Sequence, residues 1–417
     1  MTTRIDLFAR LETGLSPATL AALRACETAC AERGLGLYIV GGAVRDLLLE
    51  RDSIDLDLAV EGEVAPIAQD VASAIGGRAV LHSRFGTSTV RGAGFELDLA
   101  RTRRETYERP GALPDVAPAS LLDDLARRDF TINAMALRLT QPRGELIDPF
   151  HGQSDVLDGF VRVLHAASFQ DDATRMLRAA RYATRLGFKV ERNTELFLRR
   201  DLAYVDAISG PRLRRELSLL FEQAGAVDGT LLAQRFGVLA AVHPLLRLDR
   251  EVASRWREAL AGAHQAPADE LGFGLVADVS DDAALASLTG RLHIAGRIGR
   301  ALSDLVRLRG ASARLEALRD DPVAAVEALG GVAPAAIWAL GIREGGTIAE
   351  TCEVYLTRWR RLRPLLSGDD VIALGVTQGV AVGEALRALR RARLEGKATT
   401  RADEAALVKT MLGEKRG

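Results

Sequence analysis

The sequence is poor in cysteine, in aromatic residues and in long apolar runs. It has three cysteines and 5% aromatic residues among 417 residues. Cys26 and Cys30 lie four residues apart and Cys352 is distant, so neither a disulfide framework nor a zinc-ligand spacing occurs, which suits a reducing cytoplasm. No apolar run approaches the roughly 20 residues needed to span a bilayer, and the first residues lack a signal-peptide pattern. We therefore expect a cytoplasmic protein without a membrane segment.

The net charge of the chain is close to zero, because 55 Lys and Arg residues balance 56 Asp and Glu residues. The balance excludes a strong global field that would attract nucleic acid. Residues 358–417, however, hold 13 basic residues against 7 acidic ones. A basic segment can bind a phosphate backbone, and a solvated helix face explains the same composition equally well.

Two kinds of pattern divide the chain. Short β-rich runs alternate with helical patterns up to about residue 150, whereas Ala-, Leu- and Arg-rich helical periodicity continues from about residue 155 to the end. Prolines and glycines in 107–120 predict a loop. The fold class we expect is α+β, an α/β head with a mixed sheet followed by an all-α part. The predicted strands are 37–40, 54–60, 78–81, 88–91, 95–99 and 135–139.

Two carboxylates carry the clearest chemical signal. Asp55 and Asp57 lie in 53–60, a segment that alternates polar and apolar residues like a strand. Residues i and i+2 of a strand point to the same face, so both carboxylates project together. They repel each other unless a cation lies between them, and hard oxygen ligands favour Mg²⁺. The pair predicts a metal site, although an isolated Asp-x-Asp is more often a strand edge or turn.

A glycine turn lies fourteen residues before this pair. Gly41 and Gly42 let backbone N–H groups approach a phosphate, and Arg45 follows on the helix that the turn opens. Asp98 could add a third carboxylate from a neighbouring strand, but Glu96 shares its face, so spacing alone leaves both open. A two-metal centre needs such clustered carboxylates, and the combination indicates phosphoryl or nucleotidyl transfer.

Residues 124–136 concentrate polar groups beside an apolar strand. Arg128 is suited to neutralise a triphosphate, while Asp129 or Asn133 is suited to bond a ribose hydroxyl. Ion pairs at a helix-to-strand junction would explain two of these polar groups. They hardly explain all four, which are Arg127, Arg128, Asp129 and Asn133. We therefore expect this segment to face the nucleotide.

Residues 171–181 read as one helix with Asp172, Arg175, Arg178 and Arg181 along one side. A carboxylate beside a guanidinium offers an acceptor next to a donor. Cytosine and adenine complement that order, whereas uracil and guanine show the reverse. Asp172 with Arg175 therefore predicts selection of C and A, although an intrahelical salt bridge worth about 0.3–0.5 kcal/mol is the simpler explanation of the pair alone.

Five motifs in order resemble the class II tRNA nucleotidyltransferase and bacterial poly(A) polymerase family. They are 41–48, 55–57, 127–136, 148–152 and the row from 172 to 181. The resemblance covers residues 37–225, and 367–383 is similar to the family's tail. It implies a head, a neck, a body and a tail, which we place at 1–150, 151–225, 226–350 and 351–417.

The resemblance also implies the chemistry. It places Mg²⁺ on Asp55 and Asp57, and from its strand position we take Asp98 as the third catalytic carboxylate. The 3′-hydroxyl of a tRNA, whose elbow the body and tail hold, attacks the α-phosphate of CTP or ATP, and pyrophosphate leaves. Together with the residues above, the expected nucleotide-binding set is Gly41, Gly42, Arg45, Arg128, Asp129, Asn133, Asp172, Arg175, Arg178 and Arg181.

Three departures from the family pattern occur, and the last of them leaves the added nucleotide open. Glu50 replaces a glycine, Asp171 replaces the glutamate that opens the base-reading motif, and 105–118 lacks the basic-acidic-basic signature of the loop that helps switch the pocket from C to A. We expect an enzyme that builds or completes the CCA end. A CC-only enzyme, an A-only enzyme and a poly(A) polymerase are alternatives within the class, and a non-catalytic RNA-binding scaffold lies outside it.

Overall fold

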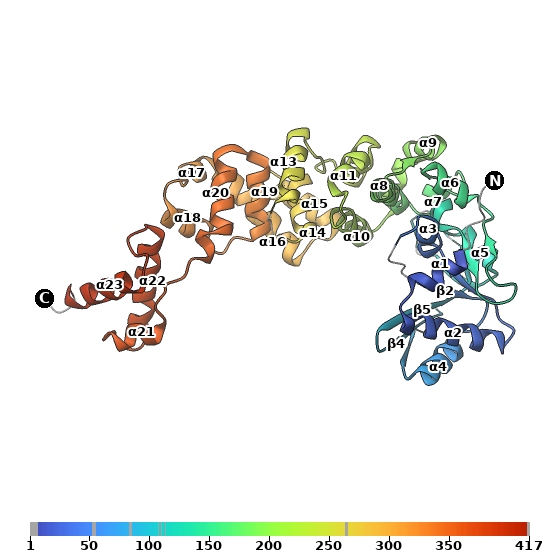
Figure 1. The fold of residues 1–417 in the computed structure, drawn as a ribbon. Helices are drawn as coiled ribbons and strands as arrows, with labels where there is room; N and C mark the ends of the chain where they lie inside the picture. Colours follow the sequence, from blue (N-terminus) through green and yellow to red (C-terminus); the bar gives the residue numbers. More distant parts are fainter. Residues whose placement is uncertain are drawn as a thin grey trace. The chain divides into compact units, whose positions relative to one another are not determined.

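The computed structural model describes residues 7–51, 56–82, 86–106, 108–109, 111–112, 114–262 and 266–414. The chain forms two compact units. Unit 1 comprises Met1–Glu216 and Gln223–Val242, and unit 2 comprises Leu217–Glu222 and His243–Gly417. Figure 1 follows the chain from unit 1 (blue and green) into unit 2 (yellow and red).

Unit 1 is built on a seven-stranded sheet with the order β3-β4-β5-β2-β1-β8-β9. Strands β2 and β5 run parallel, and every other neighbouring pair runs antiparallel, so the predicted mixed sheet is confirmed. The strands are β1 (Leu37–Val40), β2 (Asp57–Val60), β3 (Arg78–His82), β4 (Thr87–Gly92), β5 (Phe95–Arg101), β8 (Ala136–Arg138) and β9 (Leu146–Ile147). Each agrees with its predicted run to within two residues, except that 54–55 lie outside the described residues and β9 was missed.

Helices cover the sheet and continue beyond it. Helices α2 and α4 pack on each other and on β4 and β5, while Leu121 and Leu125 of α5 join Tyr38, Val40 and Ala59 in a buried cluster. The helices of unit 1 are α1 (Leu7–Gly14), α2 (Pro17–Ala31), α3 (Gly42–Leu48), α4 (Val64–Ile75), α5 (Leu121–Ala126), η2 (Thr131–Asn133), α6 (Gly152–Asp158), α7 (Ser168–Asp171), α8 (Thr174–Leu186), α9 (Arg192–Arg200), η3 (Leu202–Ala207), α10 (Gly210–Phe221), α11 (Ala226–Arg235) and α12 (Val238–Val242). The last residues of α10 belong to unit 2.

Two strand pairs contradict the sequence-based expectations. The loop predicted over 107–120 is wrong for β7 (Asp115–Pro118), which pairs antiparallel with β6 (Arg103–Thr106). Pro118 is tolerated because this two-stranded ladder leaves both strands as edges, where a missing N–H has little consequence. Strand signals also do not end at residue 155, since β10 (Phe160–Val161) and β11 (Lys189–Val190) form a short parallel pair. Two-residue strands are too short to show periodicity.

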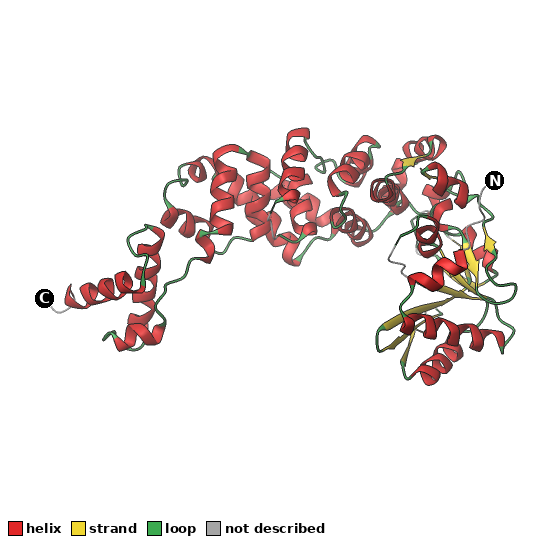
Figure 2. Ribbon diagram, viewed as in Figure 1, coloured by secondary structure: helices red, strands yellow, loops and turns green. Residues whose placement is uncertain are grey.

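The described part of unit 2 is built from helices, apart from one isolated bridge between Leu246 and Ala277, and Figure 2 shows the strands (yellow) confined to unit 1. Phe221, Trp256 and Phe273 form an aromatic cluster with centroid separations of 5.2 and 6.2 Å. The helices are α13 (Arg250–Ala261), α14 (Ala268–Val276), α15 (Asp282–Leu292), α16 (Gly296–Arg309), α17 (Ser312–Glu316), α18 (Pro322–Leu329), α19 (Pro334–Glu344), α20 (Gly346–Thr357), η4 (Trp359–Arg361), α21 (Gly368–Ala373), α22 (Val380–Leu394) and α23 (Arg401–Glu414). The predicted α+β fold class is therefore confirmed.

All three cysteines are buried and reduced. Burial raises the pKa of Cys26 to about 12, of Cys30 to about 11 and of Cys352 to about 12, so the thiolate form is scarce at neutral pH. Among the described residues, no single helix is both long enough and apolar enough to cross a membrane. Within the described ranges, the bent pair α18 and α19 meets those criteria when its two helices are taken together.

Candidate active site

A cavity of about 730 Å³ in unit 1 brings together most of the predicted site residues. Its lining comes from β2, β5, β6, α5, η2, α8 and the segments beside them. Nine predicted residues line it: Gly42, Asp57, Asp98, Arg128, Asp129, Asn133, Asp172, Arg175 and Arg178. Gly41, Arg45 and Arg181 do not line it, and Asp55 lies outside the described residues.

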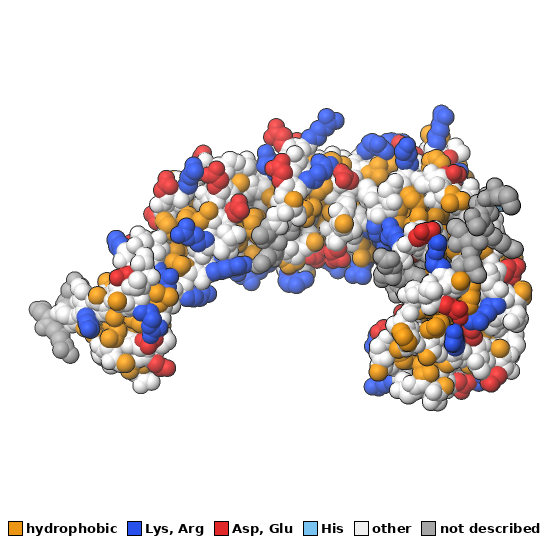
Figure 3. Space-filling model, in the orientation of Figure 1, with side chains coloured by type: hydrophobic (Ala, Val, Ile, Leu, Met, Phe, Trp, Pro, Cys, Tyr) orange, Lys and Arg blue, Asp and Glu red, His pale blue; other side chains and the backbone are white. Residues whose placement is uncertain are grey.

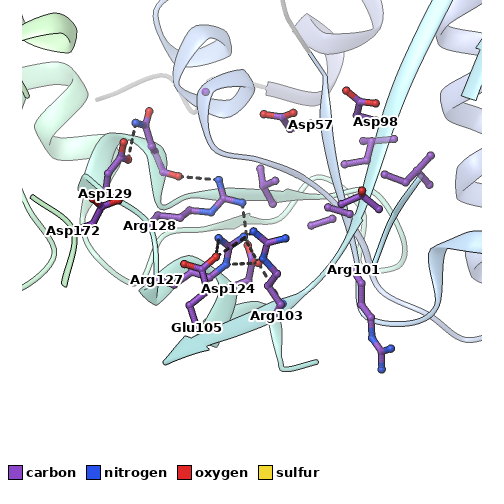
Figure 4. Close-up of a pocket in the computed structure, with 18 of the residues that line it drawn as sticks. Asp57, Asp98, Arg101, Arg103, Glu105, Asp124, Arg127, Arg128, Asp129 and Asp172 are labelled. Atoms are coloured by element: carbon purple, nitrogen blue, oxygen red, sulfur yellow. Dashed lines mark hydrogen bonds and ion pairs between the residues drawn. The ribbon is translucent and has the colours of Figure 1, made fainter. Parts of the chain in front are cut away.

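Asp57 and Asp98 lie side by side on the two parallel strands. The β2–β5 register pairs them directly, and Figure 4 shows both carboxylates on the same side of the sheet. The hydroxyl of Thr89 donates a hydrogen bond to Asp98 Oδ1 at 2.6 Å. Asp98 lines the cavity, whereas Glu96 pairs with Arg91 at 2.8 Å and does not line it, so this geometry favours Asp98 as the third carboxylate.

These two carboxylates fit a divalent cation in charge and in ligand chemistry. Protein-bound Mg²⁺ commonly takes one or two carboxylates and completes its shell with water and substrate phosphates. Within the part of the chain that the structure describes, no cluster of three or more His, Cys, Asp or Glu could hold a metal ion. Asp57 and Asp98 can therefore supply part of a metal site, to which a substrate phosphate would contribute.

The glycine turn brings Arg128, rather than Arg45, to the cavity. Gly41 has φ +70° and immediately precedes α3, and a Cβ there would lie 2.5 Å from Arg128 Nη1. Glycine is needed both for the backbone conformation and for this close approach. Arg45 is buried instead, donating hydrogen bonds to Asp46 at 3.0 Å and to the side-chain oxygen of Asn133.

A charged network surrounds Arg128, as Figure 4 shows. The buried carboxylate of Asp124 accepts from Arg128 at 2.9 Å and from Arg127 at 2.8 Å, and Glu105 on β6 accepts from Arg127 at 2.8 Å and from Arg103 at 3.1 Å. Burial alone would raise the pKa of Asp124, but the two guanidinium groups outweigh it and lower that pKa. Three guanidinium groups against two carboxylates leave a positive charge, which suits an anionic substrate.

Asp129 lies at the centre of a second buried group. It accepts hydrogen bonds from the Phe130 N–H at 2.8 Å and from Asn133 Nδ2 at 3.0 Å, and it pairs with Arg178 at 2.5 Å. Burial favours the neutral acid, yet Arg178 and Asn133 together lower the pKa of Asp129. Asp129 also raises the pKa of Arg178. Asp129 and Asn133, which were predicted to contact the ribose, are therefore hydrogen-bonded to each other, and Asp129 also pairs with Arg178 of α8.

The single helix predicted over 171–181 is wrong. Asp172 is extended, with φ −146°, and separates α7 from α8. Its Oδ1 accepts from the Thr174 N–H at 3.0 Å and from the Thr174 hydroxyl at 2.7 Å, as a helix cap does. Arg175 does not pair with Asp172 but donates to Ser168 Oγ at 2.6 Å and to the Arg127 carbonyl at 2.9 Å. Both side chains nevertheless line the cavity.

Three arginines of the cavity have a donor without an acceptor. The Nε atoms of Arg103, Arg128 and Arg178 are buried and have no hydrogen-bond partner among the described residues. Arg181 pairs with Glu216 at 3.5 Å outside the lining. Tyr182 lines the cavity and was missed, because one aromatic in an arginine-rich helix gives no motif.

Known proteins share this head. The family model described as the poly A polymerase head domain matches residues 37–162. The chain is 33% identical over 410 residues to the A-adding tRNA nucleotidyltransferase of Geobacter sulfurreducens, covering 93% of this chain and 46% of that protein. It is 32% identical over 389 residues to the A-adding tRNA nucleotidyltransferase of Halalkalibacterium halodurans, covering 88% of this chain and 87% of that protein. Thus it spans less than half the length of the Geobacter protein.

A solved structure agrees in fold over nearly the whole chain. A CCA-adding enzyme in its apo form II has a TM-score of 0.81 and 26% identity, covering 97% of this chain and 99% of that chain. The likeness therefore extends beyond the head domain into both units. With the relative from Halalkalibacterium halodurans matched over 87% of its length, the chain belongs to the tRNA nucleotidyltransferase family.

Proposed function

We propose that the chain is a template-independent nucleotidyltransferase that adds CMP, AMP or both, from CTP and ATP, to the 3′ end of tRNA. The observation that carries the proposal is the pairing of Asp57 with Asp98 on parallel strands, in one cavity with Arg128. Relatives named A-adding, CC-adding and CCA-adding support the reaction. Structural neighbours described as complexes with tRNA, ATP and CTP support the substrates.

In the proposed reaction, the 3′-hydroxyl of tRNA attacks the α-phosphate of the nucleotide and pyrophosphate leaves. Arg128 and Arg178, which both line the cavity, bind phosphate oxygens and neutralise negative charge. Mg²⁺, held by Asp57, Asp98 and Asp55, would stabilise the attacking and leaving oxygens when bound. The protein's main contribution is to hold the two reactants in line.

A basic surface on unit 2 supports an RNA partner. Two cavities, of about 330 and 340 Å³, share Pro334 and Arg360. On the face drawn in Figure 3, Lys and Arg side chains (blue) gather along the lower edge of unit 2. Arginines beside an aromatic ring suit both phosphates and exposed bases. We propose that tRNA binds this arginine surface, which consists of Arg297, Arg300, Arg360, Arg361 and Arg363 with Trp338.

The relatives leave three versions of the activity. The chain is 33% identical to the A-adding enzyme of Geobacter sulfurreducens and 33% identical to the CC-adding enzyme of Deinococcus radiodurans, the latter over 90% of both chains. Sequence identity therefore does not decide between A-addition, CC-addition and full CCA synthesis.

An assay that supplies CTP and ATP separately distinguishes these three activities. Radiolabelled CTP or ATP is offered with Mg²⁺ to tRNA that ends at the discriminator base, at C or at CC. Incorporation of both nucleotides supports CCA addition, and incorporation of one identifies a partial enzyme. Long A ladders on unrelated RNA would indicate a poly(A) polymerase instead. Complete lack of incorporation would overturn the proposal and leave a non-catalytic RNA-binding protein.

A further inference from the structure

Three arginines lie around one aromatic ring of the active-site cavity. Tyr182 of α8 lines this cavity. Three guanidinium carbons lie 4.9, 5.1 and 5.5 Å from the centre of its ring, and they belong to Arg181, Arg185 and Arg45 respectively. Guanidinium groups are attracted to the electron-rich face of an aromatic ring. Phe130 contacts Tyr182 edge to face at 5.8 Å and supports the ring from another side. Tyr182 therefore keeps three like charges close together beside the cavity.

Arg185 is the member of this group without an acidic partner. Arg45 pairs with Asp46 at 3.0 Å and Arg181 pairs with Glu216 at 3.5 Å, whereas no carboxylate among the described residues forms a salt bridge with Arg185. Arg185 is solvent-accessible, yet partial burial and the charge of Arg45 lower its pKa. Its charged form is thus less favourable than in water, and a bound anion would offset that cost.

The order of residues along α8 matches the order of groups in a nucleoside triphosphate. Asp172, two residues before the helix, is the predicted base-reading carboxylate. Arg178 pairs with Asp129, the predicted ribose contact. Arg185 follows Arg178 by seven residues, which is about two turns and about 10 Å along the helix axis. The groups that come next in a nucleotide, after base and ribose, are the phosphates.

The glycine turn, which was predicted to receive a phosphate, lies near the same part of α8. Gly42 lines the cavity, and a Cβ there would lie 3.3 Å from Arg45 Nη2. Arg45 and Arg185 share the ring of Tyr182, so Arg185 is close to this turn. Arg185 does not itself line the cavity. Only the end of a ligand that extends past Tyr182 would therefore reach it.

We propose that Arg185 binds the terminal phosphates of the nucleotide and that Tyr182 is a positioning residue that holds it there. The inference rests on the proposed nucleotidyl transfer. In that reaction the 3′-oxygen of tRNA bonds to the α-phosphorus, its proton passes to solvent, and the bond from the α-phosphorus to the bridging oxygen breaks. The β- and γ-phosphates leave together as pyrophosphate. Arg185 neutralises charge that develops on this leaving group.

The first test compares ligands with and without terminal phosphates. Pyrophosphate is titrated as an inhibitor of nucleotide incorporation, alongside AMP or CMP according to the nucleotide that the enzyme adds. Arg185→Met should raise the inhibition constant of pyrophosphate about tenfold, as for loss of a hydrogen bond between charged groups, and leave that of the monophosphate unchanged.

Arg235→Met is the matched control for this comparison. Arg235 is also an exposed arginine of unit 1 over an aromatic ring, with its guanidinium carbon 5.2 Å from the centre of Phe236. It lines none of the cavities described above. Its substitution should therefore change neither inhibition constant.

The second test addresses the ring. Tyr182→Leu removes the surface on which Arg185 lies, so it should also raise the inhibition constant of pyrophosphate, whereas Tyr182→Phe keeps the ring and should bind pyrophosphate more tightly than Tyr182→Leu. The double variant of Tyr182→Leu with Arg185→Met should be no weaker than the weaker single variant, because both changes act on one guanidinium. Effects that multiply would overturn the positioning role of Tyr182.

The outcomes separate this inference from the function on which it rests. An unchanged constant for pyrophosphate in Arg185→Met, or an equal rise for the monophosphate, would overturn the phosphate site while leaving the transferase intact. No incorporation by the wild type would overturn the transferase and this inference with it. Melting temperatures accompany each assay. If Arg185→Met fails to fold, Arg185→Lys carries the comparison, since a point charge without a planar stacking face should give an intermediate constant.

Discussion

At the scale of single residues, the site is built from charges that fix one another. Asp129 and Arg178 form one such pair, and Asp124 serves two arginines at once. Removing one member of a buried pair leaves its partner with an uncompensated charge, which is costly. Substitutions of these residues should therefore affect stability as well as activity, whereas the exposed carboxylates of the sheet should affect activity alone.

The carboxylate pair gives the first prediction. Asp57→Asn and Asp98→Asn should each lower kcat at least about 10³-fold, because a neutral amide removes a charged metal ligand and transition-state stabilisation with it. The melting temperature should change little, since both side chains are exposed. Glu96→Gln, on the same strand and face but outside the cavity, is the control. Near-normal transfer by Asp57→Asn would remove this residue from the catalyst.

The buried pair gives a pH-dependent prediction. Arg178 and Asn133 lower the pKa of Asp129 below its unfolded value of about 3.9, so the ionised carboxylate stabilises the fold above about pH 4 and this contribution disappears as the pH falls through the folded pKa. Asp129→Asn should cost about 3–5 kcal/mol at pH 7. The difference from the wild type should narrow below about pH 4 in thermal unfolding.

A surface pair provides the control for that experiment. Asp70 is half-exposed and pairs with Arg33, so Asp70→Asn should change the free energy of unfolding by less than about 1 kcal/mol. A loss in Asp129→Asn that is equally large at pH 3 and pH 7 would contradict the electrostatic origin.

Motif residues were predictable from sequence, but their supports were not. Asp57, Asp98 and Arg128 could be identified because their chemistry and spacing recur within short segments. Glu105 could not, because its partner Arg127 lies 22 residues away in the sequence and is brought close only by the tertiary fold. The predicted pairing of Asp172 with Arg175 was wrong, because it assumed one continuous helix. Asp172 instead has an extended backbone and caps α7.

At the scale of elements, strands with regular alternation were predictable and irregular ones were not. Strand β5 alternates buried and exposed residues from Glu96 to Leu99, and its register with β2 sets the carboxylates opposite each other. Strand β7 ends in Pro118, a residue that ordinarily argues against a strand. Prolines and glycines indicate a loop from local sequence alone, whereas the β6–β7 pairing joins residues that are 9 to 15 positions apart (Thr106 with Asp115, Arg103 with Pro118).

The glycine turn gives a prediction at this scale. Gly41→Ala should lower kcat/KM about 10-fold or more, because the added Cβ displaces Arg128 from the cavity. The backbone conformation of Gly41, with φ +70° and ψ −126°, should also cost a non-glycine residue about 1–3 kcal/mol. Gly34→Ala controls for a positive φ away from the cavity, since Gly34 has φ +66° but no atom within 4 Å of its Cβ position. Equal activity losses in the two variants would assign the effect to the backbone instead.

At the scale of the whole molecule, the two units contain different parts of the proposed machinery. Unit 1 contains every residue of the candidate active site, and unit 2 contains the arginine surface. Sequence predicted an α/β head followed by helices, which the fold confirms. The bounds of the four domains given above stay predictions, because successive helices without β-rich segments offer few signals of where one packed group ends.

The arginine surface gives the last prediction. Arg360→Ala with Arg361→Ala should raise the KM for tRNA about 10-fold and leave the KM for ATP unchanged, because the two guanidinium groups are proposed to bind tRNA phosphates. The slope of log KM against log salt concentration should fall by about one for each phosphate that is no longer neutralised. Arg314→Ala with Arg319→Ala removes the same charge elsewhere on unit 2 and should have little effect. Equal effects of the two double variants would indicate non-specific attraction.

The burial of every native thiol makes the molecule suitable for site-specific labelling. Maleimide dyes react with thiolates, and Cys26, Cys30 and Cys352 supply almost none at pH 7. Leu157 in unit 1 and Val380 in unit 2 are 70% and 79% exposed, so cysteines introduced there would react first. A donor and an acceptor fluorophore at these two positions could follow the separation of the units, one molecule at a time, through successive nucleotide additions.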